Sequence, residues 1–400
     1  MRRFALLLLV TAGCLARPEG RHQPAAIGAW PPAGVDVDIV AARVLDQDGD
    51  GVSDLVLASA APTAPAIYVL LGTRSGIGAG YHAQLTTSLP PLALAVGDVS
   101  GDAVPDLVTL EQAQSGGRVE AFATTDLVSF AAPWRVETAI LSTVSRDHAS
   151  IDIVDLDGDG NPDFAFGDEL RAVIGRTHDT SEAGFNATAF TELPPLSVNF
   201  TQPASAFMAS ASDGGRNLIV VSANATATYA HTRADETFEL HQLEHVPFTS
   251  HTRCDLDGDG TLDVIGGFGD WATDRPWPDA RTVNYDQDPG FGGYGTSLAT
   301  ACDELDGDPA HLVELAKLWT PQDGVQQVEV LPDLALTETP LALSTNRAAV
   351  LVKPIPGPLA DVMVEGDFDG DGERELLVVA RDGSLTCLHV GVDALTLCSP

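Results

Sequence analysis

Five short segments of the sequence share an alternation of acidic residues that suits a hard cation. They read DQDGDGVSD from residue 46, DVSGDAVPD from 98, DLDGDGNPD from 155, DLDGDGTLD from 255 and DFDGDGERE from 367. Ca²⁺ takes about six to eight oxygen ligands, and carboxylates at alternate positions of a tight loop can converge on one ion. The side chains at positions 1, 3, 5 and 9, with the backbone carbonyl at position 7, therefore predict a calcium loop. A glycine at position 6 permits the positive φ that curls the chain around the ion.

An EF-hand needs a bidentate glutamate at position 12 and a helix on each side of the loop. Neither requirement is met, because the flanking segments are strand-like and position 12 is Leu57, Phe166, Gly266 and Val378 in four of the loops.

The acidic segments recur along the chain. Two degenerate copies, in which most of the acids are lost, lie in the long intervals between these segments: ASASDGGRNLIVV from 209 and ELDGDPAHLVEL from 304. We expect them to bind no ion. The seven copies are spaced by about fifty residues, a period typical of propeller blades. The sequence therefore predicts an all-β fold, a seven-bladed β-propeller with calcium-binding hairpin loops.

Strand-like segments surround each acidic segment. An apolar run such as DIVAARVL or SIDIV precedes the loop, and a run such as DLVLAS or DFAFG follows it. The last unit contains four such runs, so ring closure need not borrow a strand from the N-terminus. In the sixth unit, RAAVLVKP (347–354) is a candidate extra strand.

The segment DQDGDGVSDLVLASAAPTAPAIYVLLG (46–72) resembles the FG-GAP or VCBS-like repeat of integrin α-subunit propellers and bacterial surface proteins, and FAFGD (164–168) and IGGFGD (265–270) echo its FG element. The resemblance extends from about residue 35 to the end of the chain. It implies four to five Ca²⁺ sites, each in a β-hairpin loop. The implied ligands are Asp46, Asp48, Asp50, Val52 and Asp54; Asp98, Ser100, Asp102, Val104 and Asp106; Asp155, Asp157, Asp159, Asn161 and Asp163; Asp255, Asp257, Asp259, Thr261 and Asp263; and Asp367, Asp369, Asp371, Glu373 and Glu375.

Two of these loops depart from the pattern. Ser100 and Ala103 replace an acid and a glycine, so the second loop is expected to be the weakest site. In the last loop Glu375 replaces aspartate, and its longer side chain is expected to reach the ion.

The net charge of the chain limits the classes of partner that it can bind. Lys and Arg total 21 against 57 Asp and Glu, a formal charge of -36. Such a chain repels nucleic acid and anionic membrane surfaces. We expect a monomer whose partner is a protein or a glycan, with no nucleic-acid partner.

The N-terminus has the pattern of an export signal: a basic start, an apolar run and small residues in MRRFALLLLVTAGCLA. TAGC resembles a lipobox, which would make Cys14 the lipidated residue; simple secretion is the alternative. We therefore expect a signal peptide over 1–20, a linker over 21–34 and the propeller over 35–400. The protein would be an outer-membrane or cell-surface lipoprotein, or secreted, and it would meet a membrane only through a lipid anchor.

The other four cysteines are an even number in an exported chain, which suggests two disulfides. Of the three pairings, we favour Cys387 with Cys398, which flank a terminal hairpin, and Cys254 with Cys302, each just before an acidic loop.

Two further patterns have a chemical interpretation. HQLEH (241–245) matches a zinc-peptidase string, but in a strand its histidines lie too far apart to share an ion. Propeller loops commonly carry ligand sites, and aromatic rings concentrate between 268 and 294, at Trp271, Trp277, Tyr285, Phe291 and Tyr294.

No catalytic motif is evident, so the expected function is a non-enzymatic adhesion or recognition module. The alternatives are a carbohydrate-active lyase or hydrolase on a propeller scaffold, or a structural component of a cell-envelope assembly.

Overall fold

The structure is a computed structural model of the chain. It describes residues 26–78, 80–113, 116–126, 128–138, 149–154, 163–167, 172–177, 187–192, 203–210, 216–222, 225–232, 237–244, 251–254, 263–266, 271–274, 281–284, 295–303, 305, 313–321, 324–338, 341–345, 351–355, 357–391 and 394–398.

Within these ranges the chain forms strands β1 to β33 and no helix, so the all-β prediction is confirmed. None of these ranges, accordingly, holds a helix that could span a membrane. All pairings between the named strands are antiparallel, and most join consecutive strands.

The strands of the described residues form seven sheets of four or five strands, numbered here in chain order. Sheet 1 contains β2 (Ile39–Leu45), β3 (Asp54–Ser59), β4 (Ala66–Leu70) and β6 (Ala83–Thr86). Sheet 2 contains β7 (Pro91–Gly97), β8 (Asp106–Ala113), β9 (Gly116–Phe122) and β12 (Trp134–Thr138). Sheet 3 contains β13 (Ser150–Val154), β14 (Asp163–Gly167), β15 (Ala172–Thr177) and β16 (Ala187–Glu192).

Sheet 4 contains β17 (Pro203–Ser210), β18 (Arg216–Ser222), β19 (Ala225–Thr232) and β20 (Thr237–Glu244). Sheet 5 contains β21 (His251–Cys254), β22 (Asp263–Gly266), β23 (Trp271–Asp274) and β24 (Arg281–Asn284). Sheet 6 contains β25 (Gly295–Asp303), β26 (Val313–Pro321), β27 (Gln327–Glu338), β28 (Leu341–Thr345) and β29 (Leu351–Pro354). Sheet 7 contains β30 (Ala360–Gly366), β31 (Glu375–Ala380), β32 (Leu385–Val390) and β33 (Leu395–Leu397).

Two small ribbons complete the described strands: β1 (Gly28–Ala29) with β5 (Gly80–Tyr81), and β10 (Thr124–Asp126) with β11 (Ser129–Phe130). The extra strand expected in the sixth unit is β29, which pairs with β27. The four strands expected in the last unit are β30 to β33.

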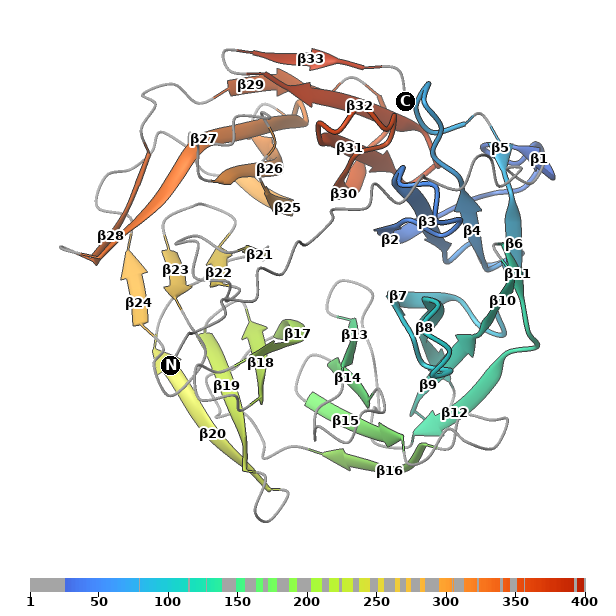
Figure 1. The fold of residues 1–400 in the computed structure, drawn as a ribbon, viewed down its shortest axis with the longest axis horizontal. Helices are drawn as coiled ribbons and strands as arrows, with labels where there is room; N and C mark the ends of the chain where they lie inside the picture. Colours follow the sequence, from blue (N-terminus) through green and yellow to red (C-terminus); the bar gives the residue numbers. More distant parts are fainter. Residues whose placement is uncertain are drawn as a thin grey trace, which may run out of the picture.

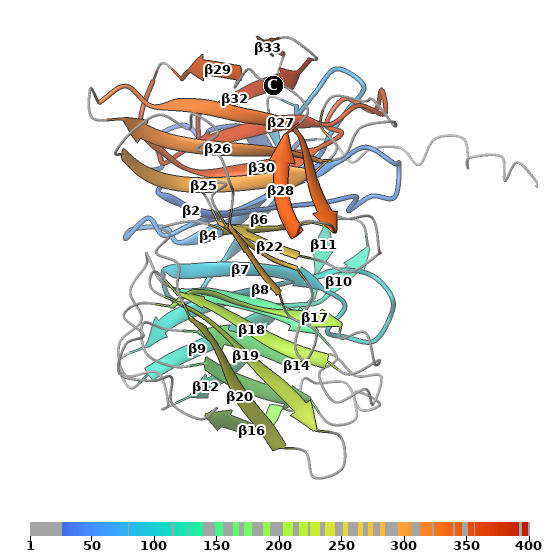
Figure 2. The same cartoon turned by 90° about the vertical axis from the view of Figure 1, so that its left-hand side faces the viewer.

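The sheets follow one another around a ring in chain order, and the first strand of each sheet lies nearest the centre (Figure 1). Figure 2 shows the ring from the side, with many strands running across its short dimension. The inner strands β2 and β30 are neighbours, so the first and last sheets meet.

The core lies between adjacent sheets. Leu55, Leu57 and Tyr68 of sheet 1 pack with Leu377 and Val379 of sheet 7. The opposite faces of the same strands pack against sheet 2, and further clusters join sheets 2 and 3 and sheets 6 and 7. Because a middle strand is covered on both faces, every residue of β3 and β4 is buried. This double burial explains why the four central residues of DLVLAS, Leu55 to Ala58, are all apolar and do not alternate with polar residues.

The junction of sheets 1 and 7 is held by backbone contacts and by the N-terminal segment. The Ile39 N–H donates to the Arg381 carbonyl at 2.9 Å. The Trp30 indole N–H donates to the Gly383 carbonyl at 2.8 Å, and its ring meets Tyr68 edge-on at 5.0 Å. Residues 26–34 of the expected linker therefore include a segment that is packed on the ring. The expected signal peptide with Cys14 lies outside the described residues.

Both predicted disulfides are confirmed. Cys254 is bonded to Cys302 with a Cα–Cα distance of 5.8 Å, and Cys387 to Cys398 with 5.1 Å. The first bond joins the inner strands of sheets 5 and 6, and the second joins β32 to the residue that follows β33.

Candidate metal-binding loops

The acidic loops are hairpins between the first two strands of a sheet, and they share one register. In the three loops that are described throughout, the residue before the loop pairs with the ninth loop residue: Leu45 with Asp54, Gly97 with Asp106 and Gly366 with Glu375. The same pairing holds for Val154 with Asp163 and for Cys254 with Asp263. Loop residues 155–162 and 255–262 lie outside the described ranges, so their expected ligands stay predictions.

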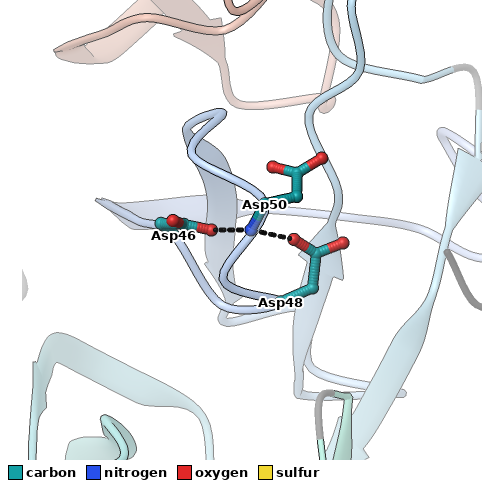
Figure 3. Close-up of side chains that lie close together, drawn as sticks. All are labelled: Asp46, Asp48 and Asp50. Carbon is teal, nitrogen blue, oxygen red and sulfur yellow. Dashed lines mark hydrogen bonds between the residues drawn. The ribbon is translucent and has the colours of Figure 1, made fainter. Parts of the chain in front are cut away.

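Loop 1 (residues 46–54) brings three of its acids together. One carboxylate oxygen from each of Asp46, Asp48 and Asp50 lies within 4.8 Å of the others. Figure 3 shows the three side chains around the Asp50 N–H, which donates to Asp46 at 2.9 Å and to Asp48 at 3.1 Å. Burial, and next the charge of Asp50, raise the pKa of Asp48. Such a group of oxygens suits a hard divalent cation.

Loop 7 (residues 367–375) repeats this arrangement with Asp367, Asp369 and Asp371. In both loops the fifth-position acid accepts from the N–H of the seventh residue, at 2.8 Å. The seventh residues, Val52 and Glu373, stay predicted ligands through their backbone carbonyls.

Glycines allow the sharp curl of these two loops. Gly49 and Gly51 have φ of 72° and 85°, and Gly370 and Gly372 have φ of 72° and 94°. The sequence predicted this conformation at position 6, and the structure adds it at position 4. Side-chain-bearing residues rarely adopt such φ values, which accounts for the repeated DGDG.

Loop 2 (residues 98–106) differs from loops 1 and 7, as expected from the residues that replace an acid and a glycine in its motif. Among the described residues it holds no group of three close acids. Its Asp98 accepts the backbone N–H groups of Gly101 at 2.7 Å, Asp102 at 3.1 Å and Ala103 at 2.8 Å, and the first acids of loops 1 and 7 accept loop N–H groups in the same way. Ala103 has a φ of 67°, where loops 1 and 7 have glycine. Val104, at the seventh position, stays a predicted carbonyl ligand.

The ninth-position acids do not belong to the groups of three close acids. Asp54 and Asp106 are fully buried and Glu375 is 3% exposed. Their carboxylates accept backbone N–H groups: from Gln47 at 2.6 Å, from Val99 at 2.9 Å and from Phe368 at 2.9 Å, respectively.

Burial is the main cause of the raised pKa values of these acids. It raises the pKa of Asp54 to about 8, opposed by the Gly72 N–H and reinforced by Asp48. It raises the pKa of Glu375 to about 7, and it raises that of Asp106.

Loops 1 and 7 touch each other where the ring closes. The Ser53 N–H donates to the Asp367 carbonyl at 2.7 Å. A Cβ on Gly370 would lie 2.8 Å from the Val52 side chain. The two described groups of three acids therefore belong to one contact between the first and last sheets.

The sequence analysis did not identify one further buried acid that accepts a backbone N–H group of its loop. Glu314 is fully buried, lies opposite Asp303 in the register of β25 and β26, and accepts the Leu305 N–H at 2.6 Å. It lies two residues beyond the ninth position of the degenerate copy that starts at 304. An alignment to the nine-residue motif without gaps therefore does not find it.

A second missed group lies in sheet 2, away from the loops. Glu120 accepts from the Ser88 N–H at 2.8 Å and from Arg135 at 2.5 Å. Burial and the neighbouring Glu120 raise the pKa of Glu111 to about 9, whereas hydrogen bonds outweigh burial and lower that of Glu120. Glu111 therefore holds the proton of this acid pair at neutral pH.

The other sequence candidates are described only in part. Residues 241–244 of the zinc-peptidase string lie in β20, the kind of element expected from the sequence, and His245 lies outside the described residues. Trp271 begins β23, and the other four aromatic candidates lie outside the described residues.

One pocket of about 410 Å³ lies beside the N-terminal segment. None of its lining residues is titratable; they are Trp30, Pro31, Ser75, Ile77, Gly78, Gly383, Ser384 and Leu385.

Comparisons with known proteins identify a fold but no family. No family model matches the sequence, and no curated protein matches it. The chain is similar to BBS1N in two crystal structures of its complex with ARL6DN. In the mercury-soaked crystal the TM-score is 0.52 at 14% identity, over 91% of this chain and 96% of the other. In the lead-soaked crystal the values are 0.51 and 12%, over 89% and 93%. A Lactobacillus plantarum protein gives a TM-score of 0.48 at 10% identity, over 84% of this chain and 91% of that one.

Proposed function

We propose that this protein is an exported, calcium-binding, seven-bladed β-propeller of the FG-GAP or VCBS-like type, which serves as a non-enzymatic recognition module for a protein or a glycan. The observation that carries the calcium proposal is the convergence of three carboxylates in loop 1 and again in loop 7. The blade interpretation is supported by seven sheets that follow one another around a ring.

The donor set of loop 1 fits Ca²⁺. Asp46, Asp48 and Asp50 would hold the ion, with the Val52 carbonyl as a further ligand. Bound calcium supplies the positive charge that offsets the repulsion among the three carboxylates. The chain's own contribution is to hold the loop closed, because backbone N–H groups within the loop already orient each of the three acids.

A calcium titration tests this proposal. Isothermal titration of the metal-free mature chain should give four to five sites, and the double variant D46N/D48N should lose one. D126N, which removes an exposed acid from β10, is the matched control and should keep the full count. At a tenfold excess of free calcium over Kd, each site adds about 1.4 kcal/mol to stability. Equal melting temperatures in calcium and in EDTA would contradict the proposal.

Export is supported by the two disulfides, since such bonds persist in oxidising compartments. Fractionation of cells that express the full chain, with metabolic labelling by palmitate, separates the two routes. A lipoprotein predicts label in the membrane fraction that is lost in C14A, whereas secretion predicts unlabelled protein in the medium. Reduced protein in the cytoplasm would contradict both routes.

The proposed recognition role does not depend on the calcium loops. It is supported by the acidic surface, which excludes nucleic acid, and by the aromatic residues between 268 and 294. A glycan array and a protein-binding screen, run beside activity assays on the bound polysaccharides, test it. Binding without turnover, weakened in W277A, supports a recognition module; cleavage of a bound polysaccharide would make the protein an enzyme.

A further inference from the structure

We infer that the proposed calcium sites of loops 1 and 7 are coupled, so that occupancy of either loop raises the calcium affinity of the other. The inference rests on the proposed function, because it concerns the regulation of those same two sites. It makes the junction between the first and last sheets respond to calcium as one unit, whereas loops 1 and 2 bind independently of each other.

One peptide group connects the two loops. It joins the Val52 carbonyl, the predicted seventh-position ligand of loop 1, to the Ser53 N–H, which donates to the Asp367 carbonyl at 2.7 Å. Asp367 is the first acid of the group of three in loop 7. Because a peptide group is planar, a carbonyl held on an ion also fixes the direction of the N–H. Occupancy of loop 1 therefore orients a donor toward the first ligand residue of loop 7.

The packing around this bond prevents the two loops from moving separately. Val52 is 5% exposed, and a Cβ on Gly370, inside loop 7, would lie 2.8 Å from the Val52 side chain. A Cβ on Gly366, the residue before loop 7, would lie 2.9 Å from the Ser53 hydroxyl oxygen. Phe368, the second residue of loop 7, is buried in the cluster that joins sheets 1 and 7. A backbone change in one loop therefore acts on the other by direct contact.

The eighth residue of the motif decides which neighbouring loops can form this bond. Ser53 holds that position in loop 1, whereas Pro105 holds it in loop 2 and Pro162 in the loop from 155. Proline has no backbone N–H to donate. Loop 2 therefore cannot bond in this way to loop 1, although sheets 1 and 2 pack against each other as sheets 1 and 7 do. The coupling is specific to the junction between the first and last sheets.

Two opposing effects set the sign of the coupling. A loop that is already ordered through the shared contact spares its neighbour part of the entropic cost of ordering, which favours joint occupancy. Cations in the two loops also repel each other. The three carboxylates of each loop offset that repulsion, and salt at about 0.15 M screens it beyond about 8 Å. The shared contact should therefore prevail, near the lower end of the usual range of about 5- to 150-fold.

Hydrogen exchange at a series of calcium concentrations measures each loop separately. In the full mature chain, peptides that cover 46–54 and 367–375 report the calcium midpoint of loops 1 and 7. D46N/D48N, which empties loop 1, should raise the midpoint of loop 7 about fivefold. D367N/D369N should raise the midpoint of loop 1 by the same factor, because coupling between binding sites is reciprocal.

A neighbouring loop supplies the matched control. D98N/D102N also removes two acids, but from loop 2, whose Pro105 cannot form the bond to loop 1. It should leave the calcium midpoint of loop 1 unchanged.

The variant S53P tests the bond itself. It removes the donor, keeps every predicted ligand of loop 1 and gives this loop the Val-Pro-Asp sequence that loop 2 has at 104–106. The midpoints of both loops should rise, and adding D367N/D369N should no longer shift the midpoint of loop 1. S53A, which retains the N–H, is its matched control and should keep the wild-type midpoints.

Different results identify which statement fails. A midpoint of loop 7 that is unchanged or lowered in D46N/D48N would overturn the coupling. A shift of loop 1 in D98N/D102N as large as that in D367N/D369N would overturn the role of the Ser53 contact. If S53P does not fold, the reciprocal shifts still decide. Wild-type loops without any calcium-dependent protection would contradict the proposed function and with it the coupling, whereas protection with independent midpoints would contradict the coupling alone.

Discussion

The disulfide between Cys254 and Cys302 should contribute more to stability than the bond between Cys387 and Cys398. The first closes a segment of 48 residues and the second a segment of 11. In the chain-entropy description, cross-linking restricts the unfolded state by about 4 kcal/mol for the longer segment and about 3 kcal/mol for the shorter. The longer bond also joins neighbouring inner strands of two sheets, so its loss acts on the contact between sheets 5 and 6.

Equilibrium urea unfolding of the double variants C254S/C302S and C387S/C398S, at one fixed calcium concentration, measures both contributions. We expect losses of about 4 and 3 kcal/mol from the free energy of unfolding. Wild-type protein unfolded in the presence of a reductant should lose at least as much as either variant. A smaller loss for C254S/C302S than for C387S/C398S would refute the reasoning from segment length.

The loop backbone and the buried acid pair predict the effects of three single substitutions on stability. A103G should stabilise the protein by about 1 kcal/mol in urea unfolding, because glycine removes the cost of the 67° φ at that position. G370A should destabilise it by about 1 to 3 kcal/mol, since the added Cβ meets the Val52 side chain at 2.8 Å and the φ of 72° disfavours alanine. E111Q should flatten the loss of stability with rising pH. The pKa of Glu111 rises from 4.5 to about 9 on folding, so its contribution is complete below pH 4.5 and is lost as pH approaches 9. Between pH 6 and 8 the wild type should therefore lose about 1.4 kcal/mol per pH unit relative to E111Q.

Much of this molecule could be predicted from the spacing of a few residue types. The strands around each loop follow from the switch between acidic and apolar runs, and both disulfides from the position of the cysteines beside loops and hairpins. The extra strand β29 was visible as an apolar run in an overlong unit. These features are local or repeat at a fixed period, which is why one sequence suffices to find them.

The features that were missed depend on distances between segments far apart in the chain. The loop motif does not distinguish Asp54 from Asp50, since both are acids in one loop. In the fold Asp54 is fully buried and accepts the N–H groups of Gln47 and Gly72, the second of which comes from beyond the third strand. Glu314 was missed because its loop is longer than the frame, and register, not sequence position, defines its role. Trp30 sits in what reads as a linker, and its hydrogen bond to Gly383 crosses almost the whole chain.

The closing junction of the ring connects these observations. Sheet 7 takes its four strands from residues 360–397, and within the described residues no strand is exchanged between it and sheet 1. The junction depends instead on apolar packing, on the bonds from Ile39 and Trp30, and on the contact between Ser53 and Asp367. Since that last contact joins loops 1 and 7, the repulsion within both groups of three acids acts at the junction itself. A cation in either loop would relieve this repulsion where the first and last sheets meet without a connecting segment. Calcium should therefore matter more for ring closure in loops 1 and 7 than in the acidic loops of the other sheets.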